Sequence, residues 1–281
     1  MSSLSVTPTD RPDALLELFG VAKPIIGTIH LPPLPGAPRY SGEPVQTIYA
    51  RAIEDARRYA DGGVDGLIVE NEGDIPFLKP DQLGPETSAC MAVATASIVD
   101  AVALPTGVLV LANATLHSIA VAKASGARFV RANQWVNAYI ANEGFLEGTA
   151  AAALRYRAQL QAQDIRVLAD VHVKHGSHAI VADRTIAELT HDAEAFDADA
   201  VIATGQRTGD PTLVEEITAI SDVAKRPVLV GSGLNADNAR ELLEHAHGAI
   251  VGSAMKQDGA WWNPVSVANT RKIMDVIEEL R

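Results

Sequence analysis

The chain has 281 residues, of which 47% are hydrophobic and 21% are charged, and its formal net charge is −12. The apolar fraction is ample for one large core, and the length suits a single α/β barrel, which commonly takes about 250 residues. The negative charge disfavours nonspecific binding to nucleic acid or to anionic membranes, because both would repel the protein. A single cysteine, Cys90, excludes an intrachain disulfide.

The first segment, residues 1–12, is predicted to be a flexible tail, and residues 13–281 are predicted to form one domain. The tail is polar and punctuated by prolines, and it lacks the apolar core of a signal peptide. No apolar run in the chain approaches the ~20 residues that span a bilayer. The sequence therefore predicts a cytoplasmic protein without stable membrane insertion.

Short apolar strands alternate with helical patterns through the domain. A leucine-rich helix at 13–19 comes first and is expected to cover the bottom of a barrel. The expected strands begin near residues 25, 66, 106, 128, 166, 199, 227 and 248. Such alternation predicts a parallel sheet with helices outside it, and the number of units predicts a closed (β/α)₈ TIM barrel. An open doubly wound sheet is the alternative, but no G-x-G-x-x-G motif follows the first strand.

Two turns of small residues follow the last two expected strands. The first is Gly231, Ser232 and Gly233, and the second is Gly252 and Ser253. Backbone amides without a neighbouring Cβ can bind a phosphate at the end of a barrel, with help from a helix N-terminus near Asn235. The alternative is that these glycines only permit tight turns with positive φ.

The fifth expected strand, 166–174, carries an unusual set of polar residues. Because strand side chains alternate, Asp170, His172 and Lys174 should share one inward face, and Glu70 ends the second strand. Glu70 or Asp170 could act as a general base with His172 as the acid, and Lys174 could form a Schiff base. Two alternatives stay open: an internal ion pair between Lys174 and a carboxylate, and a divalent metal held by Glu70, Asp170 and His172. No other cofactor is implied.

Further polar residues at strand ends are predicted to bind substrate. These candidates are His30, Asn71, Asn113, Asn133, Thr204 and Lys256. The amides of Asn113 and Asn133 suit sugar hydroxyls, although asparagine at a strand end also tolerates left-handed backbone geometry. Lys256 would add a point charge to the anion site.

Several segments together resemble the BtpA/SgcQ family. They are 23–36 (KPIIGTIHLPPLPG), 65–71 (DGLIVEN), 169–175 (ADVHVKH), 230–233 (VGSG), and 252–259 (GSAMKQDG) with 263–265 (NPV). The resemblance implies a barrel of the ribulose-phosphate-binding type. It says less about activity, because the family is named for a role in photosystem I biogenesis at thylakoid membranes, whereas other members occur in sugar-utilisation contexts.

Two functions follow from these observations. The first is an enzyme acting on a small phosphorylated sugar or nucleoside-like compound, by isomerase, lyase or aldolase, or glycosidic hydrolase chemistry. The second is a non-catalytic factor for assembly of photosystem I or another membrane-protein complex. The sequence favours the enzyme, because inward charges are costly to bury and it offers no basic amphipathic helix for a membrane surface. We also expect a homo-oligomer, since barrels of this size often pair through their outer helices.

Overall fold

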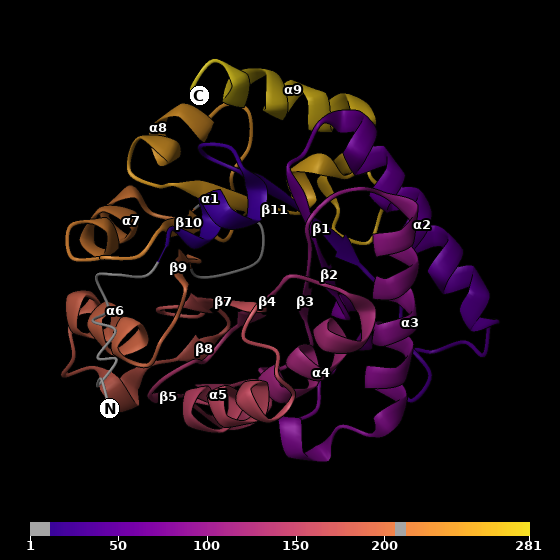
Figure 1. Cartoon of the computed structure of the whole chain (residues 1–281), viewed down its shortest axis with the longest axis horizontal. Coiled ribbons are helices and arrows are strands. Elements are labelled where there is room, and N and C mark those ends of the chain that lie inside the picture. The colour runs from indigo at the N-terminus through magenta and orange to yellow at the C-terminus, as the bar shows by residue number, and fades with distance from the viewer. Residues whose placement is uncertain (1–11, 206–211) are drawn as a thin grey trace, which may run out of the picture.

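The computed structural model describes residues 12–205 and 212–281, and its centre is a closed barrel of parallel strands (Figure 1). In spatial order the strands are β1 (Ile25–His30), β11 (Gly248–Val251), β10 (Val228–Val230), β9 (Ala200–Ala203), β7 (Arg166–Asp170), β4 (Phe129–Ala132), β3 (Thr106–Leu109) and β2 (Gly66–Glu70). Pairing of β1 with β11, in the register Ile26 to Ile250, closes the barrel. The predicted (β/α)₈ barrel is confirmed, and the open sheet is excluded.

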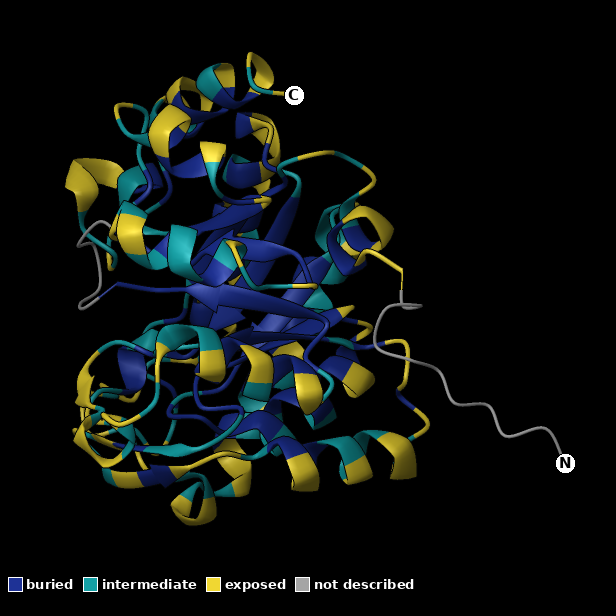
Figure 2. Cartoon of the chain, turned by 90° about the vertical axis from the view of Figure 1, so that its left-hand side faces the viewer, coloured by how far each residue is buried: buried dark blue, intermediate teal, exposed yellow. Residues whose placement is uncertain are grey.

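A ring of helices surrounds the strands. It consists of α2 (Val45–Gly62), α3 (Pro85–Ala101), α4 (Thr115–Ser125), α5 (Ala150–Gln159), α6 (Ile186–Ala195), α7 (Val214–Ser221), α8 (Ala239–Glu244) and α9 (Val267–Glu278). In α2 the apolar residues recur at helical spacing, so that Ile48, Ala52 and Ala56 are buried against the barrel. Figure 2 shows the same division throughout, with buried strands at the centre and exposed residues on the outward sides of the helices.

The helix α1 (Ala14–Phe19) closes the amino-terminal end of the barrel, as the sequence predicts. Asp13 caps it by accepting hydrogen bonds from the amides of Leu15 and Leu16, at 2.8 and 3.0 Å. Its apolar side packs on the inward side chains of the strands, and the ring of Phe19 meets Phe129 edge-on at 5.7 Å. The predicted tail was 1–12, and its residues 1–11 lie outside the described residues.

A small antiparallel sheet is added to the barrel at the end of β4. It has the order β6 (Gly144–Glu147), β5 (Ala138–Ala141), β8 (Gly176–Ser177). The sequence predicts an irregular loop at 134–147, which is wrong, because β5 and β6 form a hairpin there. The pairing of β8 with β5 ties the segment after β7 to this hairpin.

The strand β7 is shorter than predicted. It ends at Asp170, whereas the sequence pattern predicts a strand to residue 174. The amide of Val171 still donates to the carbonyl of Ile202, at 3.0 Å, and the chain then leaves the barrel to reach β8. Asp170, His172 and Lys174 therefore do not share one inward strand face, and that prediction is wrong.

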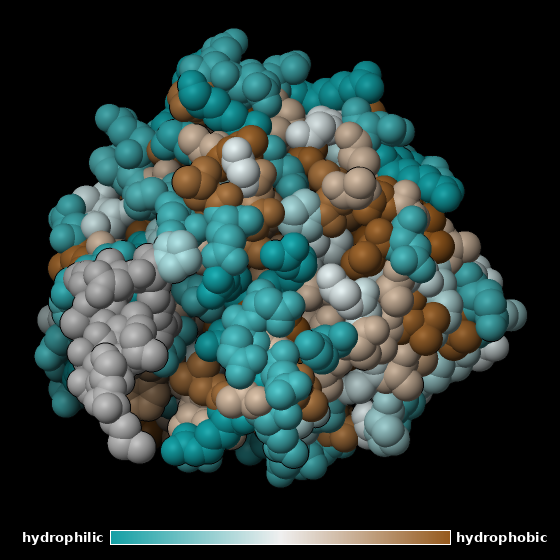
Figure 3. Space-filling view, viewed as in Figure 1, coloured by the Kyte–Doolittle hydropathy of each residue, from teal (hydrophilic) through white to brown (hydrophobic). Residues whose placement is uncertain are grey.

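The loops after the strands also contain short 3₁₀ turns. These are η2 (Glu72–Asp74), η3 (Pro80–Gln82), η4 (Ala179–Val181), η5 (Ser253–Met255) and η6 (Gln257–Gly259). Figure 3, in the view of Figure 1, shows a mosaic of hydrophilic and hydrophobic residues on that face. Among the described residues, no helix is both long and apolar enough to cross a membrane. The expected homo-oligomer stays a prediction.

The closure of the barrel by α1 can be tested with a pair of leucines on that helix. Leu15 is 3% exposed and Leu16 is 58% exposed. We expect Leu15→Ala to lower the free energy of unfolding by about 2–4 kcal/mol, because it leaves a cavity at the barrel bottom. Leu16→Ala should change it by less than about 0.5 kcal/mol. Urea denaturation measures both, and equal effects would contradict the packing described here.

Candidate functional site

A cavity of about 790 Å³ opens at the carboxyl end of the barrel. Its walls are formed by residues at the ends of the strands and in the loops that follow them, which is where barrel proteins bind their ligands. The predicted site residues that line it are His30, Glu70, Asn133, Lys174, Gly231, Ser232, Gly233, Gly252 and Ser253. The sequence therefore placed most of its candidates at one mouth.

Both glycine loops, which we define as 231–233 and 252–253, lie in the wall of this cavity. Gly233 has φ +74, a conformation that favours glycine. A Cβ on Gly252 would lie 3.1 Å from a carbon of the His30 ring, so the loop is packed closely against β1. Helix α8 begins at Ala239 rather than at Asn235, whose side chain instead accepts the amides of Asp237 and Asn238. Any anion would thus contact the loops rather than a helix N-terminus, and the amide of Gly231 would not take part, because it donates to the carbonyl of Ala203 at 2.7 Å.

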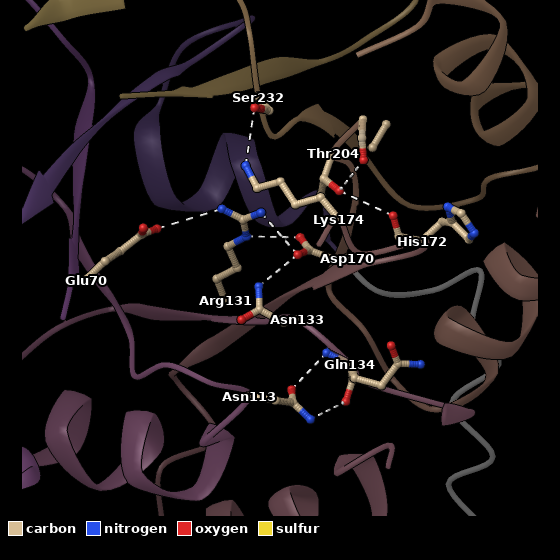
Figure 4. Close-up of polar contacts among 12 residues, drawn as sticks. Glu70, Asn113, Arg131, Asn133, Gln134, Asp170, His172, Lys174, Thr204 and Ser232 are labelled. Carbon is tan, nitrogen blue, oxygen red and sulfur yellow. Dashed lines mark hydrogen bonds and ion pairs between the residues drawn. The ribbon is translucent and has the colours of Figure 1, made fainter. Parts of the chain in front are cut away.

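Arg131 and Asp170 form a buried ion pair at the base of the cavity (Figure 4). Arg131 donates through Nε and Nη2 to the two oxygens of Asp170, at 3.0 and 3.1 Å. Asn133 donates a third hydrogen bond to Asp170, at 2.9 Å. Burial alone would lower the pKa of Arg131, but Asp170 and Glu70 together raise it above its usual value. This bidentate arrangement holds the guanidinium plane in one orientation.

Glu70 lies between a histidine and this arginine. Its carboxylate oxygens are 3.7 Å from Nε2 of His30 and 3.7 Å from Nη1 of Arg131. Its Oε1 is buried and accepts no hydrogen bond from the described residues. Burial raises the pKa of Glu70 to about 7, against a partial opposing effect of Arg131. A carboxyl group with this pKa can give or take a proton near neutral pH.

Lys174 points across the cavity toward the first glycine loop (Figure 4). Its Nζ donates to Oγ of Ser232 at 3.2 Å. Burial, and then the neighbouring Arg131, lower the pKa of Lys174 to about 8. Within 12–205 and 212–281 it makes no ion pair with a carboxylate, because Asp170 is already bound by Arg131. The alternative of an internal ion pair at Lys174 is therefore wrong.

His172 lies outside the cavity. Its ring points away from Lys174 (Figure 4). It contacts the ring of His178, with centroids 3.8 Å apart and planes tilted by 32°. Burial, and then His178, lower the pKa of His172 to about 4. Glu70, Asp170 and His172 consequently do not converge, and the described residues contain no group of three metal-ligating side chains. The metal alternative built on these three residues is contradicted, because β7 ends before His172.

Two other candidates hydrogen-bond to the protein rather than face the cavity. Asn71 is fully buried, donates to Asp74 at 2.9 Å and accepts the amide of Leu111 at 2.7 Å. Asn113 has φ +55, and its side chain donates to the carbonyl of Gln134 and accepts its amide, at 3.1 and 2.8 Å. Neither lines the cavity. The alternative of left-handed backbone geometry holds for Asn113, whereas Asn71 has φ −83 and hydrogen-bonds to its neighbours.

Thr204 and Lys256 also lie away from the cavity. The hydroxyl of Thr204 donates to the carbonyl of His172, at 3.3 Å. Lys256 is 1% exposed, with Nζ 3.6 Å from Asp55 and 5.3 Å from the centroid of Tyr59. Burial lowers the pKa of Lys256 to about 8. The η5 turn sends this side chain out between the barrel and α2, so the prediction that it contacts substrate is not supported.

Arg131 is the principal residue of the site that sequence reasoning missed. It interrupts the apolar segment Phe129–Ala132, and an arginine within so short a buried strand needs a carboxylate partner. That pattern was a usable signal. The aromatic cavity residues Phe77, Tyr139 and Trp261 gave no comparable signal, because they lie in loops and in the added sheet.

Comparison with known proteins assigns the chain to a family. The family model described as "BtpA family" matches residues 21–279. The chain belongs to the BtpA family. A Synechocystis relative named photosystem I biogenesis protein BtpA is 37% identical over 246 residues, covering 87% of this chain and 84% of that protein. A Caenorhabditis elegans relative whose name calls it mitochondrial is 38% identical over 271 residues, covering 94% of this chain and 97% of its own. The cytoplasmic location stays a prediction.

Solved structures similar to this BtpA-family chain share its barrel. The geranylgeranylglyceryl phosphate synthase of Thermoplasma acidophilum, solved with sn-glycerol-1-phosphate, has a TM-score of 0.58 at 16% identity, covering 96% of this chain and 100% of that one. A tryptophan synthase chain from M. tuberculosis has a TM-score of 0.59 at 16% identity, covering 95% of this chain and 99% of that one. At 16% identity, the similarity to these structures shows that this chain shares their fold, and it carries no statement about activity.

The environment of Glu70 predicts a dependence of stability on pH. The pKa of Glu70 is 4.5 in the unfolded chain and about 7 in the native state. At a pH between these two values, the native state holds a proton that the unfolded state has released. The wild type should therefore lose stability as the pH rises through this window. Glu70→Gln has no titrating group at this position. Its free energy of unfolding, relative to that of wild type, should therefore be about 2 kcal/mol higher at pH 8 than at pH 5.

Urea denaturation at the two pH values measures this difference. The matched control is Glu54→Gln, which removes an exposed carboxylate on α2. It should leave the difference between pH 5 and pH 8 unchanged. Parallel pH profiles for wild type and Glu70→Gln would refute the raised pKa.

Proposed function

We propose that this BtpA-family protein is an enzyme acting on a small phosphorylated sugar or nucleoside-like compound. The phosphate lies against the two glycine loops, and the reacting part of the substrate lies over Glu70 and Arg131. The observation that carries the proposal is the hydrogen bond from Lys174 to Ser232. It joins a cation held in the cavity to the loop whose amides would bind the anion.

The geometry favours a ligand-binding role for Lys174. Its amine lies beside the hydroxyl of Ser232 in the first glycine loop, where a phosphate bound by that loop would receive a hydrogen bond from the amine as well. A Schiff base would instead require the amine to reach a substrate carbonyl elsewhere in the cavity. Arg131 has its Nε and Nη2 committed to Asp170, and its Nη1 faces Glu70.

Glu70 is the best placed general acid or base. It combines a pKa of about 7 with an oxygen that has no hydrogen-bond partner among the described residues. Such a group can move a proton to or from a substrate carbon or a leaving oxygen. Asn133 lines the cavity beside the ion pair and is available to contact a hydroxyl group. Isomerase, lyase and glycosidic hydrolase reactions all use this step.

The alternative is a non-catalytic role in the assembly of a membrane-protein complex, and the name of the Synechocystis relative assigns that protein to photosystem I biogenesis. Relatives from a nematode and from the archaeon Pyrococcus abyssi are each 38% identical to this chain, against 37% for the Synechocystis protein. In this chain Glu70, Arg131 and Lys174 line a cavity rather than an outer surface. A scaffold would gain nothing from burying these three charged groups. The proposal of an enzyme therefore explains the buried charged residues, which a non-catalytic assembly factor would not need.

Calorimetric titration with ribose 5-phosphate at pH 7 tests the proposal. We expect Lys174→Met to weaken binding by about 10- to 100-fold, because a charge-assisted hydrogen bond is lost. Lys272→Met, which removes an exposed lysine on α9, is the matched control and should bind like wild type. Equal affinities for all three proteins, or no binding by wild type to any sugar phosphate, would contradict the phosphate site.

The pKa of Lys174 gives a second readout from the same titration. Because that pKa is about 8, raising the pH from 7 to 9.5 removes most of the positive charge. Wild-type affinity should fall over this range, whereas the affinity of Lys174→Met should change much less. A fall of the same size in both proteins would assign the pH effect to another group.

A further inference from the structure

The cavity has a second kind of wall that the proposed function does not use. Phe77, Leu111, Tyr139 and Val173 line it together, and we call this set the apolar wall. Tyr139 and Val173 belong to one buried hydrophobic cluster, on which Phe77 packs. The ring of Tyr139 is held in place by stacking on His178, with centroids 5.2 Å apart and planes 13° apart. The tyrosine ring of the apolar wall is therefore supported from behind by a second ring.

The apolar wall faces the glycine loops across the mouth of the barrel. In the closed strand order β10 lies opposite β3, and β11 lies opposite β4. The glycine loops follow β10 and β11, whereas Leu111 follows β3 and the hairpin with Tyr139 follows β4. Glu70, Arg131 and Lys174 lie between the two sides. A ligand that spans the cavity would meet amides, then charges, then aromatic and aliphatic carbon.

A bare sugar phosphate does not suit this sequence of surfaces. It carries hydroxyl groups on nearly every carbon, and those near the apolar wall would lose hydrogen bonds to water without replacing them. A flat aromatic ring would instead stack on Phe77 and bury apolar area. Polar groups flank the wall, since Glu72, Asn142 and Glu143 also line the cavity. They can bind the nitrogen-bearing edge of a heterocycle.

We propose that the substrate is a phosphorylated sugar that carries a planar nitrogen heterocycle, as a nucleoside monophosphate does. The ring lies against the apolar wall, the sugar lies over Glu70 and Arg131, and the phosphate occupies the glycine loops. The inference rests on the proposed phosphate site, and it narrows the substrate class to compounds with a ring at the end remote from the phosphate.

Calorimetric titrations with ribose 5-phosphate, uridine 5′-monophosphate and adenosine 5′-monophosphate test the inference. At least one nucleotide should bind wild type about tenfold more tightly than ribose 5-phosphate, because stacking adds to the phosphate contacts. Phe77→Ala should remove most of that difference and leave the affinity for ribose 5-phosphate unchanged. Retained binding of ribose 5-phosphate also shows that the variant is folded.

The matched control is Phe145→Ala, on the hairpin that carries Tyr139. Phe145 is 40% exposed and does not line the cavity, so its loss should leave all three affinities unchanged. If ribose 5-phosphate binds as tightly as both nucleotides, or if Phe77→Ala weakens all probes equally, the inference fails and the phosphate site stands. If no phosphorylated probe binds wild type, the inference and the proposed function fail together.

Discussion

The bidentate pair between Arg131 and Asp170 is the interaction on which the site depends. A buried guanidinium is costly to remove from water unless a carboxylate matches it, and Asp170 supplies both of its oxygens. Because Asp170 is committed, Lys174 is left to face the glycine loop, and the ion-pair contacts of Glu70 with His30 and Arg131 are both as long as 3.7 Å. Burial is the first cause of the raised pKa of Glu70 and of the lowered pKa of Lys174, and Arg131 opposes the first shift and adds to the second.

Barrel closure brings these groups together from distant parts of the chain. The strand β4 pairs with β7 in the register Ala132 to Ala169, which sets Arg131 beside Asp170. Glu70 ends β2, which is separated from β4 by β3. Glu70 therefore approaches the guanidinium of Arg131 from the side opposite Asp170. Parallel strands end at the same face, and the glycine loops after β10 and β11 therefore open onto the same cavity.

Sequence patterns predicted the barrel and the glycine loops because both depend on local composition. The sequence patterns did not predict the end of β7, because the residues after Asp170 alternate in polarity as they would in a longer strand. A distant contact, the pairing of β8 with β5, is what draws that segment away. Asn113 was equally ambiguous, because an amide at a strand end can serve a ligand or a backbone. Its role depends on Gln134, which the fold brings close.

The added segments complete a cavity that the barrel strands alone would leave open. The hairpin of β5 and β6 supplies Tyr139 and follows β4, which lies opposite β11. The segment after β2 supplies Phe77, which packs on the same hydrophobic cluster as Tyr139. Charged groups that lack full partners lower the stability of the protein, and that cost is typical of binding and catalytic sites. A barrel kept only for its outer surface would be more stable with apolar residues at Glu70 and Lys174. The retained charges, enclosed by an added apolar wall, favour chemistry inside the barrel.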